Sequence, residues 1–551
     1  MKMRNQNMWL FRVFLICTLC LNVTGSVRAQ VSESVIHMDK SFYVSGEIIW
    51  YTLHLPEFFN TLDRVVQVQI ADDRGNIIEE YKLRTNGKTF VTGYYKVPYD
   101  APTGVYRIFF HGVHQFIGQN IKLAEVEVPV YNDFEKVTAE MTLSHDPVRQ
   151  ASFMTDLSVD ISMSGDAVAK ELSELNIVIK DASGNPVAAQ LSVSVVDAEL
   201  CGRGVIRPAA SVDYRTVEGL HEGMVVKGTL KTKEGGPLQV NVLGLYASDV
   251  QRMYYTKSDD FGSFFAKVPY FTGQRQLQFL GYQAEVDDFD VELSYELSPG
   301  PIQTQVEYTS EVITYLELSR KRKNIYRYFT TLEHTLDAQP SEELPQELKP
   351  GVRFKMQEYE LFDNMHSFFG ELITALKFDE KDDVFTARLE NPRGSAEAET
   401  HLSGAPLFIV DGKVTRNGDF IARMDLSLIV YVDLYFDPKM LRKYFNVVGR
   451  SGVVIITTRM PDSPFPEEEL EDVFVVNGVL APARFSQPGN AEIPIIAPQL
   501  YWDGGLETDY HGTSSVQFMQ SDDLSSFRVV VVAQTPDGRR GMGTLEYKLA
   551  Q

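Results

Sequence analysis

The sequence predicts a mainly β, multidomain chain of β-sandwiches with a small α+β domain and one or two helices. Apolar and polar residues alternate with a period of two, as in Val66–Ile70 and Leu191–Val195, and this alternation is typical of strands with one buried face. Turn signals rich in Asp, Asn and Gly separate the alternating runs, as at Asp181–Pro186. Helical spacing is found at 311–336 and 361–378, and Pro438–Asn446 is a further short helical stretch, so helices form a small part of the expected fold.

Length and composition indicate several folded domains and limit the classes of partner. The chain has 551 residues, of which 44% are hydrophobic and 23% charged, as in globular domains. That length corresponds to about three to five domains of ~100–200 residues each. A net charge of −23 argues against nucleic acid and against unassisted binding to anionic lipid headgroups.

Residues 1–29 are expected to be a secretory signal peptide. Three cations, Lys2, Arg4 and Arg12, precede an apolar core at Val13–Val23, and small residues around Ala29 offer a cleavage site. We therefore expect an exported protein.

Residues 31–130 alternate between apolar runs and turns throughout, so a β-sandwich is expected there. The segment HMDKSFYVSGE resembles the opening of the second macroglobulin domain of the α2-macroglobulin family. The matching positions are Asp39, Lys40, Tyr43, Gly46 and Glu47. The resemblance implies turn and edge-strand positions for these residues, and it requires no chemistry of them.

Three further β domains are expected along the chain. Residues 131–205 resemble the following macroglobulin domain, and residues 465–551, with Tyr501-Trp502-Asp503, resemble a later one. Between them, residues 220–295 resemble the regulatory-like domain found beside carboxypeptidases, through Val226–Leu230 and Thr256–Ser263. The resemblances imply separate small sandwiches whose edges and loops are the working surfaces.

A helical segment and linker are expected over 305–345, where apolar residues recur at helical offsets. The basic run Arg320–Lys323 has two interpretations: a solvated helix face, or a docking patch for an acidic partner.

Residues 350–460 are expected to form the α+β domain. Its strands are predicted at Pro406–Val410, Leu428–Leu434 and Val453–Thr458, which are nearly continuous apolar runs and so should be covered on both faces. This stretch, with its Asp411-Gly412 turn, resembles the plug domain of TonB-dependent outer-membrane receptors, especially the Bacteroidetes form. Since the sequence after Arg459 lacks the repeated strands of a membrane barrel, a plug-like domain without a pore is expected.

Partner binding is predicted at the turns of this domain, because free loops on a rigid sheet are common binding positions. The predicted residues are Lys413, Arg416, Gly449 and Arg450.

The sequence offers no recognisable catalytic, metal or cofactor site. Cys201 is followed by Gly-Arg-Gly rather than by the Gly-Glu-Gln of a macroglobulin thioester, and it is expected to be a small buried hydrophobe. Neither a Gly-x-Ser-x-Gly elbow nor a His-Glu-x-x-His motif occurs. The acidic clusters at 287–292 and 466–472 lack the spacing of a calcium loop, so solvated surface is expected. We therefore expect a protein that is not an enzyme.

Three functions remain open from the sequence, and the third of them is an enzyme with a site assembled across domains. The first is a non-enzymatic scaffold or interaction protein of the periplasm or outer membrane, docking to an outer-membrane transport or assembly complex; by resemblance, its partner would be a receptor-like barrel. The alternative is a macroglobulin-like protease trap or surface defence protein without a thioester, for which Ala338–Pro350 is the candidate bait segment. Neither requires nucleic acid or a small-molecule cofactor.

Overall fold

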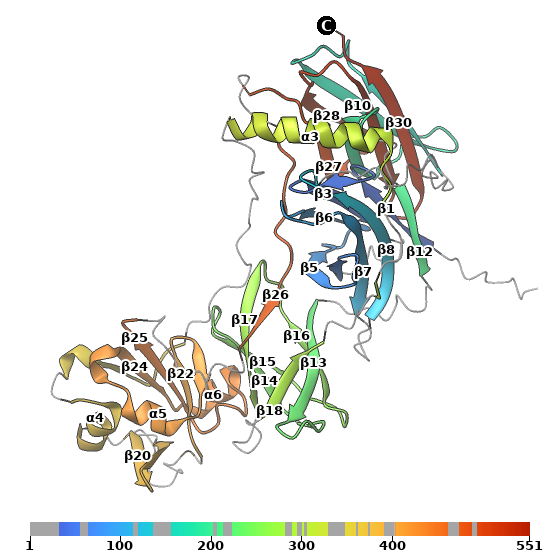
Figure 1. Ribbon diagram of the computed structural model, residues 1–551. Coiled ribbons are helices and arrows are strands. Elements are labelled where there is room, and N and C mark those ends of the chain that lie inside the picture. Colours follow the sequence, from blue (N-terminus) through green and yellow to red (C-terminus); the bar gives the residue numbers. More distant parts are fainter. Residues whose placement is uncertain are drawn as a thin grey trace, which may run out of the picture.

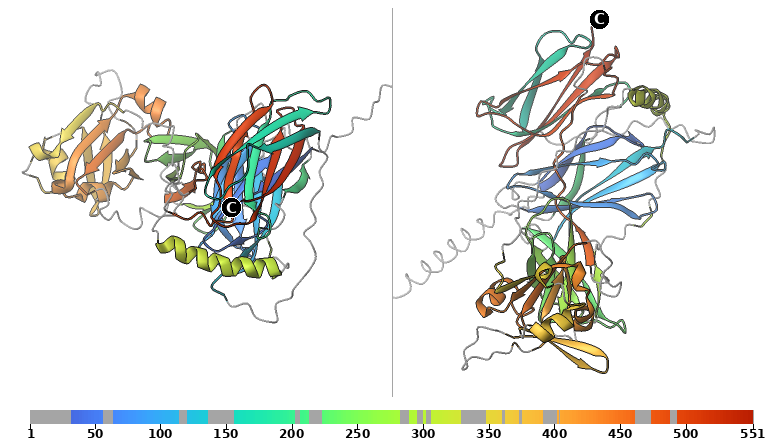
Figure 2. Two further views of the ribbon diagram at one scale, coloured as in Figure 1. Left: turned by 90° about the horizontal axis from the view of Figure 1, so that it is seen from above. Right: turned by 90° about the vertical axis from the view of Figure 1, so that its left-hand side faces the viewer.

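The computed structural model describes residues 32–550 except for the following segments: 56–63, 114–119, 136–155, 202–205, 213–222, 282–288, 295–299, 302–305, 329–347, 360–361, 373–374, 391–401, 403, 461–472 and 488–492. The signal-peptide prediction at 1–29 therefore lies outside the described residues. Within them the fold is mainly β, with several sheets and four α-helices. Figures 1 and 2 show two stacked sandwiches, then a third sandwich, with an α+β domain at the far end.

The middle sandwich packs a four-stranded sheet, β12-β1-β3-β6, against a five-stranded sheet, β2-β8-β7-β4-β5. The strands of the first sheet are β1 (Ser32–Met38), β3 (Ile48–His54), β6 (Phe90–Lys96) and β12 (Ile206–Val212). Those of the second are β2 (Tyr43–Val44), β4 (Val65–Ala71), β5 (Ile77–Arg84), β7 (Gly104–Val113) and β8 (Asn120–Tyr131). Strand β12 joins this sandwich from beyond the predicted 31–130 range.

The upper sandwich combines segments that are far apart in the sequence. One sheet is β28-β10-β9 and the other is β27-β11-β29-β30. The strands are β9 (Leu157–Met163), β10 (Leu172–Asp181), β11 (Gln190–Asp197), β27 (Gln499–Glu507), β28 (Thr513–Met519), β29 (Ser526–Gln534) and β30 (Arg540–Lys548). The expectation of two separate sandwiches at 131–205 and 465–551 is therefore wrong. Each segment offers only three or four of these strands, and each buries its apolar face against the other.

The lower sandwich pairs the sheets β16-β13-β18 and β15-β14-β17-β26. Its strands are β13 (Met224–Thr232), β14 (Leu243–Ala247), β15 (Arg252–Thr256), β16 (Ser263–Val268), β17 (Gln274–Gly281), β18 (Phe289–Leu293) and β26 (Val473–Asn477). Strand β26 was expected in the C-terminal sandwich, but it pairs with β17 instead. The chain after β26 then runs along the middle sandwich to the upper one (Figure 1), and Leu480 N donates to Lys82 O at 2.7 Å.

The α+β domain has the five-stranded sheet β19-β24-β25-β22-β23, in which β22 and β25 are parallel. Its strands are β19 (Val352–Lys355), β22 (Leu407–Val410), β23 (Lys413–Thr415), β24 (Ile429–Tyr435) and β25 (Val453–Thr458). A separate hairpin joins β20 (Leu376–Lys381) to β21 (Val384–Leu389). The helices are α4 (Met365–Leu372), α5 (Gly418–Arg423) and α6 (Pro438–Tyr444).

Both faces of this sheet are covered, as the apolar runs predict. On one face Phe408 and Ile456 pack with Phe368 of α4 and Ile421 of α5. The helix expected over 361–378 is shorter than predicted, because the chain from Leu376 forms β20 and turns at two Asp residues with positive φ.

Tight turns of one kind recur in the sandwiches. In the turn at Asp72, the side-chain Oδ1 accepts hydrogen bonds from Arg74 N and Asn76 N at 3.0 and 2.8 Å. Gly75 follows with φ 86°, a left-handed conformation that glycine adopts without steric cost. The same arrangement recurs at Asp181, Asp259 and Asp509. The turn at Asp72 connects the paired strands β4 and β5, whereas the other three turns connect strands of the two facing sheets of a sandwich.

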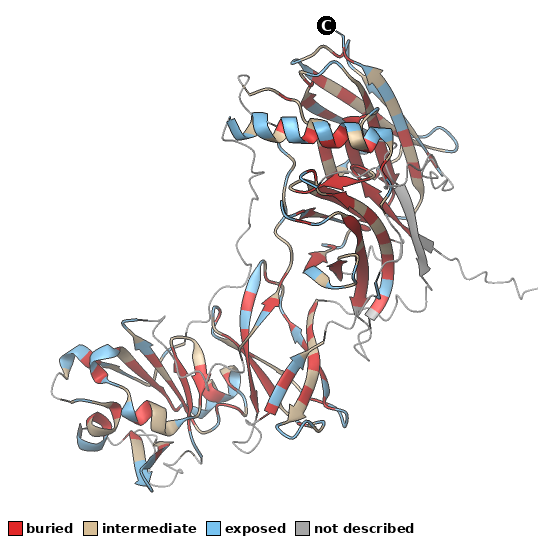
Figure 3. Ribbon diagram, in the orientation of Figure 1, coloured by how far each residue is buried: buried red, intermediate tan, exposed pale blue. Residues whose placement is uncertain are grey.

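Helix α3 (Ser310–Tyr328) lies across the side of the middle and upper sandwiches (Figures 1 and 2). Its outer side is exposed (Figure 3). Its buried residues recur every three or four positions and are Val312, Tyr315, Leu316, Ser319 and Arg322. No helix among the described residues is long and apolar enough to span a membrane.

Candidate functional site

The predicted docking loop between β22 and α5 lies against the lower sandwich. Val414 N donates to Gln278 Oε1 at 2.6 Å, and Gln278 Nε2 donates to Val414 O at 2.6 Å. Val414 also joins an apolar cluster that contains Tyr246 and Leu280 of the lower sandwich. The loop therefore helps to form a domain interface, which we call the lower junction.

The four predicted docking residues do not form one open surface. Arg416 donates from Nη2 to Val448 O at 3.2 Å, and Lys413 is half-buried. Gly449 is buried, and a Cβ there would lie 2.4 Å from Phe445 Cβ. Arg450 is exposed. The premise of a free loop is wrong, because the apolar sheet face had to be covered and the lower sandwich covers it.

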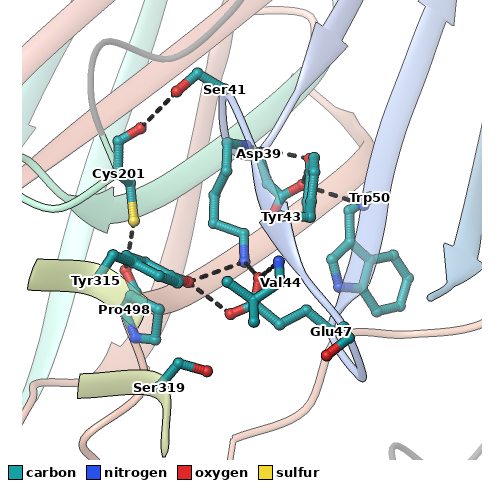
Figure 4. Close-up of polar contacts among 12 residues, drawn as sticks. Asp39, Ser41, Tyr43, Val44, Glu47, Trp50, Cys201, Tyr315, Ser319 and Pro498 are labelled. Carbon is teal, nitrogen blue, oxygen red and sulfur yellow. Dashed lines mark hydrogen bonds and ion pairs between the residues drawn. The ribbon is translucent and has the colours of Figure 1, made fainter. Parts of the chain in front are cut away.

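The macroglobulin-like motif at 39–47 forms a buried ionic cluster with α3. Lys40 is 3% exposed, and its Nζ lies 2.6 Å from Glu47 Oε2 and 3.3 Å from Tyr315 Oη. Tyr315 donates to Glu47 Oε1 at 2.6 Å. Figure 4 shows Tyr315 of α3 beside Glu47 of the β2–β3 turn. The motif residues therefore hold the helix on the middle sandwich.

The electrostatics of this cluster follow from burial and pairing. Burial alone would lower the pKa of Lys40, but the charge of Glu47 raises it above its ordinary value. Burial alone would raise the pKa of Glu47, yet the charge and hydrogen bond of Lys40 lower it. Burial raises the pKa of Asp39 to about 7, although Lys40 and the hydrogen bond from Tyr43 oppose the shift. Lys40 and Glu47 are thus a paired cation and anion.

The basic run of α3 forms intramolecular bonds. Lys323 Nζ lies 2.8 Å from Oδ1 of the fully buried Asp133. It also donates to Ser45 O at 2.6 Å. Arg320 donates to the Asp133 carbonyl. Arg322 Nη2 lies 3.6 Å from an Asp523 carboxylate oxygen in the upper sandwich. Three of the four cations in the run are therefore held within the fold, and Lys321 is exposed. Together with the cluster around Lys40, the run forms what we call the upper junction.

Cys201 is a buried thiol at this junction, as predicted. It is fully buried and packs with Val44 and Leu316. Its Sγ lies 3.8 Å from Pro498 O (Figure 4), and burial raises the pKa of the thiol. A thiol that remains protonated is a poor nucleophile.

A second polar seam of the upper junction lies between the facing sheets of the middle and upper sandwiches. His37 Nδ1 lies 2.7 Å from Ser192 Oγ, His37 Nε2 lies 3.2 Å from Ser194 Oγ, and His54 Nε2 lies 2.9 Å from Ser192 Oγ. The His37 ring lies 5.1 Å from that of Trp502. All four hydrogen-bonding residues are buried, and burial lowers the pKa of His37 to about 3. The imidazoles are therefore neutral structural groups.

Sequence reasoning missed this seam and the ionic cluster. The available signal was the alternation of Ser192 and Ser194 with apolar residues, which places the two serines on one face of a strand. Periodicity shows which residues share a face, but it does not show what covers that face.

The described residues contain no group of three or more His, Cys, Asp or Glu that could hold a metal ion. In the first acidic cluster, Asp290 and Glu292 form exposed pairs with Lys233 and Lys231 at 3.0 and 2.6 Å. Asp287, Asp288 and the second cluster at 466–472 lie outside the described residues, as does most of the candidate bait segment 338–350.

Comparison with known proteins gives a coarse structural likeness. No protein-family model and no curated protein matches the chain. Trypsin-activated α2-macroglobulin from Escherichia coli is 9% identical with a TM-score of 0.23, and the match covers 95% of this chain and 42% of that one. Methylamine-reacted Salmonella α2-macroglobulin is 10% identical with a TM-score of 0.24, covering 95% and 40%. The chain thus spans less than half the length of these proteins and resembles bacterial α2-macroglobulins only at this coarse level.

Proposed function

We propose that this chain is an exported, non-enzymatic scaffold or interaction protein that docks to an outer-membrane transport or assembly complex. The supporting observation is that polar contacts hold the domains against one another. His37 lies 2.7 Å from Ser192 between the middle and upper sandwiches. Val414 and Gln278 exchange hydrogen bonds across the lower junction. Fixed domains present their edges and clefts in a constant arrangement, as a scaffold requires.

The plug-like and regulatory-like motifs support an outer-membrane partner, because such domains occur together in TonB-dependent receptors. This part of the proposal is an analogy between motifs, and fold alone does not determine function. A receptor-like barrel is the partner class that it favours, at the periplasmic side of the outer membrane.

The test is cross-linking of the tagged full chain in the cell envelope, followed by identification of the linked proteins. We expect one discrete outer-membrane partner, which the Cys201→Ser variant should retain because that thiol is buried within the fold. Recovery of the chain in the cytoplasm, or of no envelope partner, would contradict the proposal. Cleavage within 338–350 followed by retention of the protease would instead support the trap.

A further inference from the structure

A cleft of about 500 Å³ lies where the three sandwiches meet. Trp50 of β3 and the strand β6 line the middle-sandwich side. Tyr270 of the lower sandwich, the segment 479–484 and Gly505 of β27 line the rest. The volume falls within the range of about 300–1,000 Å³ that is typical of ligand sites.

The cleft runs along a sheet edge. Strand β6 is the terminal strand of its sheet, and among the described residues its outer edge pairs with no strand. The neighbouring edge strand β5 is already covered, because Lys82 forms a parallel bridge with Val479. The edge of β6 is therefore a template on which an extended peptide can add as a further strand.

The charge of the cleft is opposite to that of the chain. Its described lining contains the cations Arg84, Lys88 and Arg484 and no Asp or Glu, although the chain has 75 acidic and 52 basic residues. The Arg84 guanidinium lies 4.0 Å from the Tyr270 ring centroid. Lys88 pairs with Glu507 at 2.8 Å, and both side chains are about half exposed, so this pair is weakly held. Arg484 is exposed.

We propose that this cleft binds an extended acidic peptide of a partner protein, added as a strand beside β6. Its carboxylates would face Arg84, Lys88 and Arg484. Its apolar side chains would lie over Tyr94, whose ring is 5.6 Å from that of the buried Trp50. The inference rests on the proposed interaction function, and it adds a docking site and the chemistry of the partner.

The experiment measures fluorescence anisotropy of labelled octapeptides with the full mature chain. The probes are an octapeptide of alternating valine and glutamate, its valine–lysine counterpart, and the glutamate peptide N-methylated at alternate residues. The valine–glutamate peptide should bind and the valine–lysine peptide should not. N-methylation of the glutamate peptide should weaken its binding at least tenfold, because it removes the donors that strand pairing needs. Equal binding of the N-methylated peptide would overturn strand addition.

Two charge reversals test the position of the site. Arg484→Glu should weaken binding about tenfold, since it replaces an attraction by a repulsion. Lys439→Glu, at an exposed position of α6 outside the cleft lining, is the matched control and should leave affinity unchanged. An unchanged affinity for the Arg484 variant would overturn the proposal.

Other occupants give distinct results. Competition by polygalacturonate without any binding of the acidic peptide would assign the cleft to an anionic polysaccharide and overturn the proposal. Self-association in sedimentation velocity that Arg484→Glu abolishes would assign it to a second copy. If no peptide binds while an envelope partner still cross-links to the Arg484 variant, the cleft proposal fails and the scaffold function stands. Peptide binding without any envelope partner would support the cleft proposal and contradict the proposed function.

Discussion

The upper and lower junctions both hold neighbouring parts of the fold together, but they do so with different chemistry. The upper junction relies on the buried Lys40–Glu47 pair, on Asp133 with Lys323, and on the His–Ser seam. The lower junction relies on an apolar cluster that includes Leu280 and Leu407. Buried ion pairs add little net stability but are costly when half of the pair is removed, whereas apolar contact stabilises in proportion to buried area. We therefore expect the upper junction to require its exact pairing of side chains, and the lower junction to tolerate substitutions that keep its apolar area.

The largest expected effect comes from breaking the ionic cluster. Lys40→Met leaves Glu47 half-buried without its cation, and we expect the free energy of unfolding to fall by about 3 kcal/mol. Urea unfolding followed by tryptophan fluorescence is suited to this measurement, because Trp50 lies in the middle sandwich and Trp502 in the upper one. Lys231→Met breaks an exposed pair with Glu292 and should cost at most about 1 kcal/mol. Equal effects of the two changes would show that the buried ionic cluster costs no more to break than an exposed pair.

The second effect concerns the apolar junction. Leu280→Ala should cost about 2–3 kcal/mol by leaving a cavity, and the loss should not depend on salt. Hydrogen exchange should accelerate in β17 and β23, while the tryptophan transition stays in place because neither Trp50 nor Trp502 contacts this cluster. A comparable shift of the tryptophan transition would mean that the two junctions unfold as one unit.

The third effect is the pH dependence of the upper junction. The folded pKa of His37 is lowered to about 3, so the unfolded state binds more protons below about 6.5, and stability should fall as pH falls through that window. His37→Gln should flatten the slope of the tryptophan transition by about 1.4 kcal/mol per pH unit. Asp39 gives the opposite sign, because its folded pKa is raised to about 7 and its carboxylate destabilises the fold as pH rises. Asp39→Asn should therefore steepen the slope, and a shift in the same direction for both variants would refute this assignment.

The smallest effect is expected at the thiol. Cys201→Ser should cost about 1 kcal/mol, as a small polar change in a packed site, and should leave partner cross-linking intact. Loss of function with an unchanged melting temperature would show that the thiol has a chemical role.

Much of the local structure could be predicted from the sequence, but its assembly could not. The strands of the α+β domain and the Asp-x-x-Gly turns follow from apolar runs and turn chemistry. The partners of β11 did not follow, because β27 and β29 lie hundreds of residues away and alternation specifies no partner. The premise of a free docking loop was wrong for a related reason, since a loop on a sheet edge is free only when no other domain covers it.

The distribution of the upper sandwich over two distant segments has a consequence for how the chain folds. Ala189 N bonds to Thr508 Oγ1 across 319 residues. Closing so long a loop adds little to the equilibrium cost, because each doubling of length adds only about 0.6 kcal/mol. It does slow folding, since such non-local pairings form late. In a chain that emerges from its N-terminal end, β9, β10 and β11 must wait with open strand edges until residues 499–548 arrive, while the lower sandwich needs only β26. The interval before that arrival is when this chain is most exposed to aggregation and has most need of a chaperone.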